Sequence, residues 1–261
     1  MYPARIRVLA PTLVLALAGQ ALAHHTTPSP VPRAARTRVR ADLGLTFFDL
    51  EGHSGDYETL TLAGDWRPPI PLLVGVRVPL HLLHVEGEEG QAGLGDLSLL
   101  RAGVLVERAE GSLLVVASGE LPTGDDERGL GAGHAELAAG LAGALRRGHW
   151  ILSANAAYLQ SFGDHDEGAE HHHTFIDPHD ERQLELGAGV VRDTGGWFAG
   201  AALLGEIPLV EESEGARLLA GLQGGLQRGR FRWTLTGTAS LVGEAPYTAR
   251  VVLGAEWRFS D

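Results

Sequence analysis

The chain has 261 residues, of which 36 are glycine and none is cysteine or lysine. Its 33 acidic residues outnumber the 21 arginines, and the resulting net charge of −12 argues against a nucleic-acid partner, because phosphate binding requires a basic surface. An apolar content of 44% excludes a disordered chain, and the absence of cysteine excludes disulfides, thiolate metal sites and cysteine nucleophiles. A mean hydropathy close to zero excludes a helical membrane protein, but not a β-barrel, whose alternating strands average to zero.

The first 23 residues have the three parts of a secretory signal peptide. Arg5 and Arg7 precede an apolar run over 8–17, and Ala21-Leu22-Ala23 forms a small-x-small cleavage pattern. The apolar run is shorter than a spanning helix requires, which favours a signal peptide over the alternative of an N-terminal anchor helix. We expect residues 24–35, which are rich in proline and show no strand pattern, to be a flexible lead-in to a barrel over 36–261.

From residue 36 onward, apolar and polar residues alternate with the period of two that is typical of β-strands. Dense glycine and the absence of a 3.6-residue period disfavour helices, and only the alanine-rich stretch 135–145 offers helix as a competitor. Arg101 breaks the alternation within 94–107, which indicates a bulge or a misplaced boundary. The twelve predicted strands are 36–49, 56–67, 71–84, 94–107, 111–121, 133–146, 149–162, 182–193, 196–207, 215–227, 231–242 and 247–259.

These strands suit a tilted membrane crossing of about 9–11 residues, and an even number of them closes a barrel without an unpaired edge. The connections predicted to face the cell exterior are mostly long and acidic: 50–55, 85–93, 122–132, 163–181, 208–214 and 243–246. The opposite ones are short and mostly contain arginine: 67–71, 107–111, 147–148, 193–195 and 228–229. This two-sided pattern is typical of outer-membrane barrels. Aromatic residues expected to form interface girdles on the apolar face are Trp66, Trp150, Trp197, Trp233, Tyr247, Trp257 and Phe259.

The sequence therefore predicts an all-β protein, a transmembrane antiparallel β-barrel of about 12 strands in the bacterial outer membrane. Its expected partners are outer-membrane lipid, the barrel-insertion machinery and a small-molecule solute. A soluble β-sandwich or a periplasmic barrel is the alternative fold, because soluble sheets also alternate.

The strand face opposite the apolar face would line the lumen. Its charges of both signs can pair across the interior, either to neutralise a plugged barrel or to shape a polar path. The residues predicted to line the lumen are Arg77, His81, Glu120, Glu136, Glu185, Arg217, Arg232, Arg250, Glu256 and Arg258.

Residues 164–181 are rich in histidine and acids, and this composition suits a loosely held Zn, Ni, Cu or Fe ion. The candidate metal ligands are His165, His171, His172, His173 and His179. The alternative is a solvated loop that binds nothing. No cofactor is required by any other feature of the sequence.

Enzyme signatures are missing, since the chain has no G-x-S-x-G, P-loop or H-E-x-x-H motif. His149, Ser153 and Asn155 share a strand face, but this face points inward, whereas a lipase-like barrel needs its nucleophile at the lipid. We predict no catalytic residues and no enzymatic activity.

Two glycine- and aspartate-containing stretches carry a resemblance to a known family. Gly93-Leu94-Gly95-Asp96-Leu97 and the stretch 121–131, which begins Leu-Pro-Thr-Gly-Asp, resemble the outer-membrane transporter family named for the meta-pathway of phenol degradation. That family is related to fatty-acid and aromatic-hydrocarbon channels, so the resemblance implies passage of a small aromatic or hydrophobic solute. From the residues alone, Pro122 ends a strand, Gly124 permits a tight turn and Asp96 orients a turn.

Three functions thus remain open. The leading one is a solute channel, the second is a metal-binding envelope protein using 164–181, and the third is a structural or surface-interaction barrel with a plugged lumen.

Overall fold

The computed structural model describes residues 37–50, 53–68, 70–108, 110–163, 176, 181–210, 215–243 and 247–259. The predicted signal peptide, the lead-in and the five candidate metal-binding histidines lie outside these residues. In the described part of the chain, no helix is long and apolar enough to cross a membrane.

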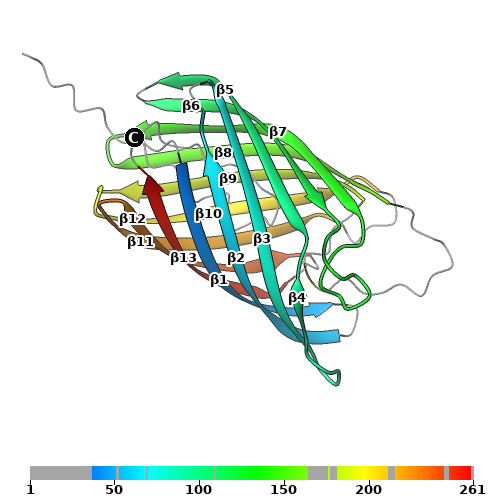
Figure 1. Cartoon of the computed structure of the whole chain (residues 1–261). Coiled ribbons are helices and arrows are strands. Elements are labelled where there is room, and N and C mark those ends of the chain that lie inside the picture. Colours follow the sequence, from blue (N-terminus) through cyan, green and yellow to red (C-terminus); the bar gives the residue numbers. More distant parts are fainter. Residues whose placement is uncertain are drawn as a thin grey trace, which may run out of the picture.

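One antiparallel sheet contains all the strands and closes into a barrel (Figure 1). Its strands are β1 (Thr37–Leu50), β2 (His53–Trp66), β3 (Leu72–Val85), β4 (Gln91–Leu94), β5 (Leu97–Arg108), β6 (Gly111–Leu121), β7 (Ala135–Arg147), β8 (Trp150–Phe162), β9 (Arg182–Asp193), β10 (Trp197–Pro208), β11 (Arg217–Arg228), β12 (Phe231–Val242) and β13 (Ala249–Phe259). β4 and β5 pair in succession with β3 and are two pieces of one broken strand. The fold is therefore a closed 12-stranded antiparallel barrel, as predicted.

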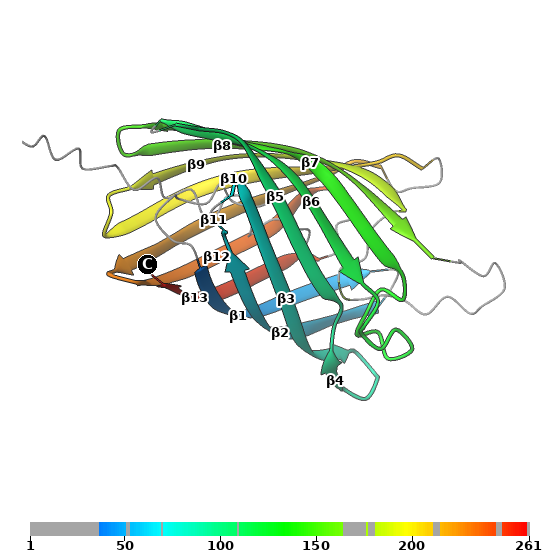
Figure 2. The same ribbon diagram turned by 45° about the horizontal axis from the view of Figure 1, so that its top comes forward.

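Closure joins the two ends of the described chain. β1 pairs with β2 on one side and with the last strand, β13, on the other, where Thr37 lies opposite Phe259. The pairing of β2 with β3 completes the ring. Both views show the C-terminal end at the opposite end of the barrel from β4 (Figures 1 and 2). No strand edge is left open along the seam, which a barrel in lipid requires.

The outer surface is apolar because alternate residues of each strand turn outward. Leucine, valine and aromatic side chains that a soluble protein would bury are exposed here; Leu222, for example, is 70% exposed. The charged residues of the same strands face the interior, where Arg38, Arg232 and Glu256 are buried. A soluble β-sandwich would show the reverse arrangement, so the fold excludes that alternative.

Two local irregularities explain why alternation fails within 94–107. The strand is interrupted at Gly95 and Asp96, and a register shift lies between Val104 and Val106 of β5. This finding confirms the bulge indicated by Arg101. The alanine-rich stretch 135–145 forms the strand β7 rather than a helix.

The first connection is shorter than predicted. The sequence analysis placed an outer loop at 50–55, but the ladder continues until Leu50 pairs with His53, so only residues 51–52 connect β1 and β2. Polar side chains in this stretch do not end the strands, because ladder hydrogen bonds use only backbone groups. The β6–β7 connection, by contrast, spans 122–134.

Aromatic side chains gather at the end of the barrel with short turns. Trp66, Trp150, Trp197 and Trp233 are all exposed there, as an interface girdle requires. Tyr247 does not belong to the girdle and corrects the prediction: only 3% of it is exposed. Tyr247 precedes β13, so the alternation of that strand does not determine its direction. Burial raises the pKa of the Tyr247 hydroxyl.

Candidate functional site: the barrel interior

Charged side chains in the interior are segregated around the ring. Six arginines lie on the contiguous wall formed by β12, β13, β1, β2 and β3, which we call the basic wall. They are Arg38, Arg40, Arg77, Arg232, Arg250 and Arg258. Four glutamates lie on β6, β7, β9 and β10, which we call the acidic wall. They are Glu120, Glu136, Glu185 and Glu206.

Ion pairs neutralise the basic wall near the short-turn end. Arg38 donates hydrogen bonds to Asp65 (2.5 Å) and to Glu256 (3.3 Å), and it thereby links β1 to both neighbouring strands. Arg258 donates to the other oxygen of Glu256 at 2.5 Å. Arg232 is buried, and its guanidinium carbon lies 4.0 Å from the ring centroid of Phe198, which is a cation–π contact. This end of the wall is therefore a rigid network across the closure seam.

The acidic wall brings like charges together near the long-loop end. Glu120 lies directly opposite Glu136 on the neighbouring strand, and Glu185 lies directly opposite Glu206. Like charges in this arrangement destabilise a sheet unless other groups compensate. Ser98 donates a hydrogen bond to Glu120, and Gln183 donates one to Glu185. His134 compensates Glu136, since its Nε2 lies 3.3 Å from Oε1 of that glutamate.

The ten residues predicted to line the lumen thus fall into groups that the sequence did not separate. Arg77, His81 and Arg250 border one interior cavity together with Glu120. The remaining predicted residues are Glu136, Glu185, Arg217, Arg232, Glu256 and Arg258, and all of them are buried or partly buried. Their role in transport stays a prediction.

Apolar side chains also point inward, a feature that the sequence analysis did not anticipate. One cluster on β3, β5, β6 and β7 contains Leu73, Leu100, Leu114, Val116 and Ala142. A second cluster contains Ile151, Val191 and Phe198. The interior therefore contains packed apolar regions as well as the charged side chains of the basic wall.

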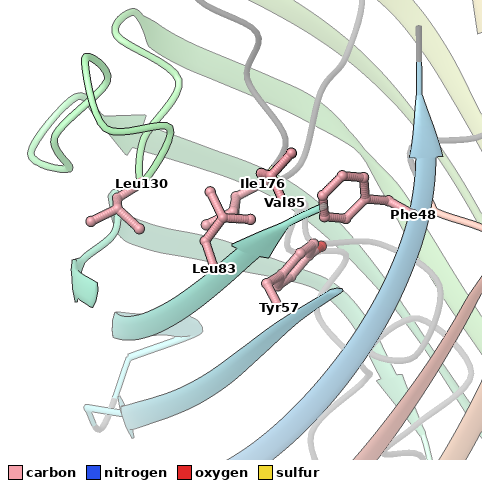
Figure 3. Close-up of a cluster of buried hydrophobic side chains, with 6 residues drawn as sticks. All are labelled: Phe48, Tyr57, Leu83, Val85, Leu130 and Ile176. Carbon is pink, nitrogen blue, oxygen red and sulfur yellow. The ribbon is translucent and has the colours of Figure 1, made fainter. Parts of the chain in front are cut away.

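A third apolar cluster lies at the mouth of the barrel (Figure 3). We call it the mouth cluster; its members are Phe48, Tyr57, Leu83, Val85, Leu130 and Ile176. Leu130, which is 1% exposed, comes from the β6–β7 connection, whereas Ile176 comes from the region between β8 and β9. Leu130 and Ile176 are therefore packed inward at the entrance.

Asp96 anchors the β6–β7 connection at this entrance. Its Oδ1 accepts hydrogen bonds from the backbone N–H groups of Thr123 (2.8 Å) and Gly124 (2.7 Å). Its Oδ2 accepts one from the N–H group of Ala132 at 2.6 Å. A side chain at Gly124 would clash, because a Cβ there would lie 2.7 Å from the backbone oxygen of Leu130. The prediction that Asp96 orients a turn is confirmed, and the two glycine–aspartate stretches are in direct contact.

Below the mouth cluster lies a cavity of about 90 Å³ that is partly open. Its floor and walls come from β1, β2, β3, β5, β6 and β13, and its roof comes from Leu130, Gly131, Ala132 and Ile176. His81 lies in its wall, and its Nδ1 is 2.9 Å from the hydroxyl of Thr59.

Among the residues that the structure describes, no group of three or more histidine, aspartate or glutamate side chains could hold a metal ion. Ser153 and Asn155 lie on the inner face of β8, as predicted, and His149 Nδ1 lies 3.2 Å from the backbone oxygen of Asp193.

Comparison with known proteins supports the fold. No family model matches the chain, and no curated protein matches it either. Among solved structures, the chain is similar to the COG4313 outer membrane channel from Pseudomonas putida F1, with a TM-score of 0.69 and 12% identity over 90% of this chain and 100% of that one. The KdgM porin in complex with disordered oligogalacturonate gives a TM-score of 0.54 at 8% identity, over 85% of this chain and 99% of that one. The translocator domain of the autotransporter NalP from Neisseria meningitidis gives 0.54 at 14%, over 93% and 92%.

At these identities the comparisons establish the fold alone, which is that of outer-membrane channel barrels. Membership of the family named for the meta-pathway of phenol degradation stays a prediction, because no family model matches.

Proposed function

We propose that this protein is a bacterial outer-membrane channel through which a small solute passes along the basic wall of the barrel. The observation that carries the proposal is the inverted distribution of side chains: apolar residues face outward around the ring, while charged residues of both signs face the interior, with six arginines on the basic wall and four glutamates on the acidic wall. A lipid-facing exterior and a polar interior track are what a passive pore requires.

The solute is small and partly apolar. Two members of the mouth cluster, Leu130 and Ile176, belong to the roof of the cavity, so a solute entering from the long-loop end meets them first. The charged wall then lies beneath it. Support for an aromatic or hydrophobic solute also comes from the resemblance to transporters of phenol degradation.

Single-channel recording tests this function. Purified full-length protein reconstituted into a planar bilayer should produce discrete current steps in potassium chloride. A second assay, swelling of proteoliposomes in isotonic solutions of neutral solutes, should show uptake of small solutes. Electrically silent bilayers together with non-swelling liposomes would refute the channel and favour the structural barrel with a plugged lumen.

A metal-handling role remains the second candidate. It is supported by the five histidines of 164–181, which lie outside the described residues. Calorimetric titration with Zn or Ni should show a binding isotherm that deletion of 165–179 abolishes. An unchanged isotherm after the deletion would contradict this role.

A further inference from the structure

Two arginines in the cavity beneath the mouth cluster lack the partners that their neighbours have. Arg77 enters the cavity from β3 and Arg250 from β13, on either side of β1 and β2. Neither makes a hydrogen bond or an ion pair with any residue that the structure describes, and the Nε of Arg250 is buried without an acceptor. Both residues are partly buried, and a guanidinium that borders an interior cavity without an acceptor favours an anion.

The acids that border the same cavity are already engaged. Asp42 accepts from Arg40, with Nε–Oδ distances of 2.5 and 2.7 Å. Asp96 is saturated by the three backbone N–H groups of the β6–β7 connection. Glu120 accepts a hydrogen bond from Ser98 at 3.1 Å. The carboxylates that border the cavity therefore already accept hydrogen bonds. Two of its three arginines, Arg77 and Arg250, have no acceptor among the described residues.

The space available to a ligand beside Arg77 and Arg250 is the cavity that both side chains border. The roof and one side of the cavity are apolar, through Leu130, Ile176 and Val252. A ligand with one anionic end and an apolar body matches both parts of this lining.

We propose that Arg77 and Arg250 form a binding site for the carboxylate of a small organic monoacid, and that this acid is the solute of the channel. The fork of a guanidinium matches a carboxylate, and the apolar roof excludes water from the remainder of the molecule. This assignment rests on the proposed function, because it names the class of solute that the channel carries.

Benzoate and the neutral molecule benzyl alcohol are the matched probes. We expect benzoate to bind the detergent-solubilised full-length protein in calorimetry and to reduce the single-channel current in the bilayer, whereas benzyl alcohol at the same concentration does neither. Arg77→Gln and Arg250→Gln should each weaken benzoate binding about tenfold or more, as expected for the loss of a charge-assisted hydrogen bond. Arg77→Lys should retain part of the affinity, because the charge remains.

Arg228→Gln is the control, since Arg228 is exposed at the end of β11 and its loss changes the net charge equally. This variant should bind benzoate as the unmodified protein does. Equal binding of benzoate and benzyl alcohol would overturn the carboxylate site, and so would unchanged affinity in both glutamine variants. Phosphate bound as tightly as benzoate would overturn the assignment to an organic acid.

The two proposals can fail separately. A protein that binds benzoate but passes no current would refute the channel and uphold the site. A protein that conducts but whose current and calorimetry ignore benzoate would uphold the channel and refute the site.

Discussion

The anchoring of the β6–β7 connection by Asp96 gives the sharpest prediction of the structure. Asp96 is 5% exposed, and its two carboxylate oxygens accept three backbone N–H groups from a segment 27 to 36 residues further along the chain. Replacing it with alanine removes all three acceptors at once. The connection should then leave the mouth of the barrel while the strands remain closed.

The size of the effect follows from the number of bonds. A hydrogen bond to a charged group is worth about 1.5–3 kcal/mol, and hydration of the released N–H groups returns part of this, so we expect Asp96→Ala to weaken docking of the connection by about 3–6 kcal/mol. Asp96→Asn keeps the acceptor for Thr123 and Gly124 but presents an NH₂ group to the N–H of Ala132. It should lose about a third to a half of that amount, in line with one broken bond of the three.

Amide hydrogen exchange read by mass spectrometry measures this directly. Peptides covering 122–133 should exchange far faster in Asp96→Ala than in the unmodified protein, with Asp96→Asn between them. Peptides from β11 and β12, on the far side of the ring, provide the internal control. Undiminished protection of 122–133 in the alanine variant would refute the anchoring role.

Four further substitutions test the packing, each by thermal unfolding of the purified protein in detergent. Leu130→Ala truncates a side chain that is 1% exposed and should lower the free energy of unfolding by about 2–5 kcal/mol. An unchanged midpoint of thermal unfolding would contradict the packing of the mouth cluster. Arg38→Met removes the guanidinium that pairs with Asp65 and with the buried Glu256, and it should lower the free energy of unfolding by about 3–5 kcal/mol, so a stability gain would show that the ion pairs of Arg38 are dispensable. Gly225→Ala places a Cβ 2.1 Å from the backbone oxygen of Trp233 and should destabilise strongly, whereas Gly237→Ala meets nothing within 4 Å and should be tolerated; equal effects of the two would argue against this packing.

Strand positions were predictable because alternation reports directly on which face of a strand meets lipid. The segments 182–193 and 231–242 match β9 and β12 residue for residue. Where the signal failed, the cause was local. Tyr247 lies outside its strand and so does not follow the strand's parity, and the first connection shortens because backbone pairing continues through polar side chains.

The sequence predicts which residues of the site face inward, but not how they are arranged. Alternation identified Arg77 and Arg250 as inward-facing, but their shared cavity depends on strand pairing and barrel closure, which bring β3 and β13 into proximity. The role of Asp96 also depends on residues distant in the sequence, because backbone N–H groups of the β6–β7 connection donate to its carboxylate. The inward apolar clusters were missed, since an apolar residue on the polar face looks like an exception to the pattern until the ring is closed.

The central claim is that solute and ions pass through the interior of the barrel, and the absence of cysteine makes a direct measurement straightforward. Thr61 and Leu62 are neighbours on β2: Thr61 borders the interior cavity, while Leu62 is exposed on the outer face. A water-soluble, charged thiol reagent added during single-channel recording should reduce the current stepwise in Thr61→Cys and leave Leu62→Cys unchanged. Unaltered current in Thr61→Cys, with labelling verified by mass spectrometry, would contradict passage through the lumen.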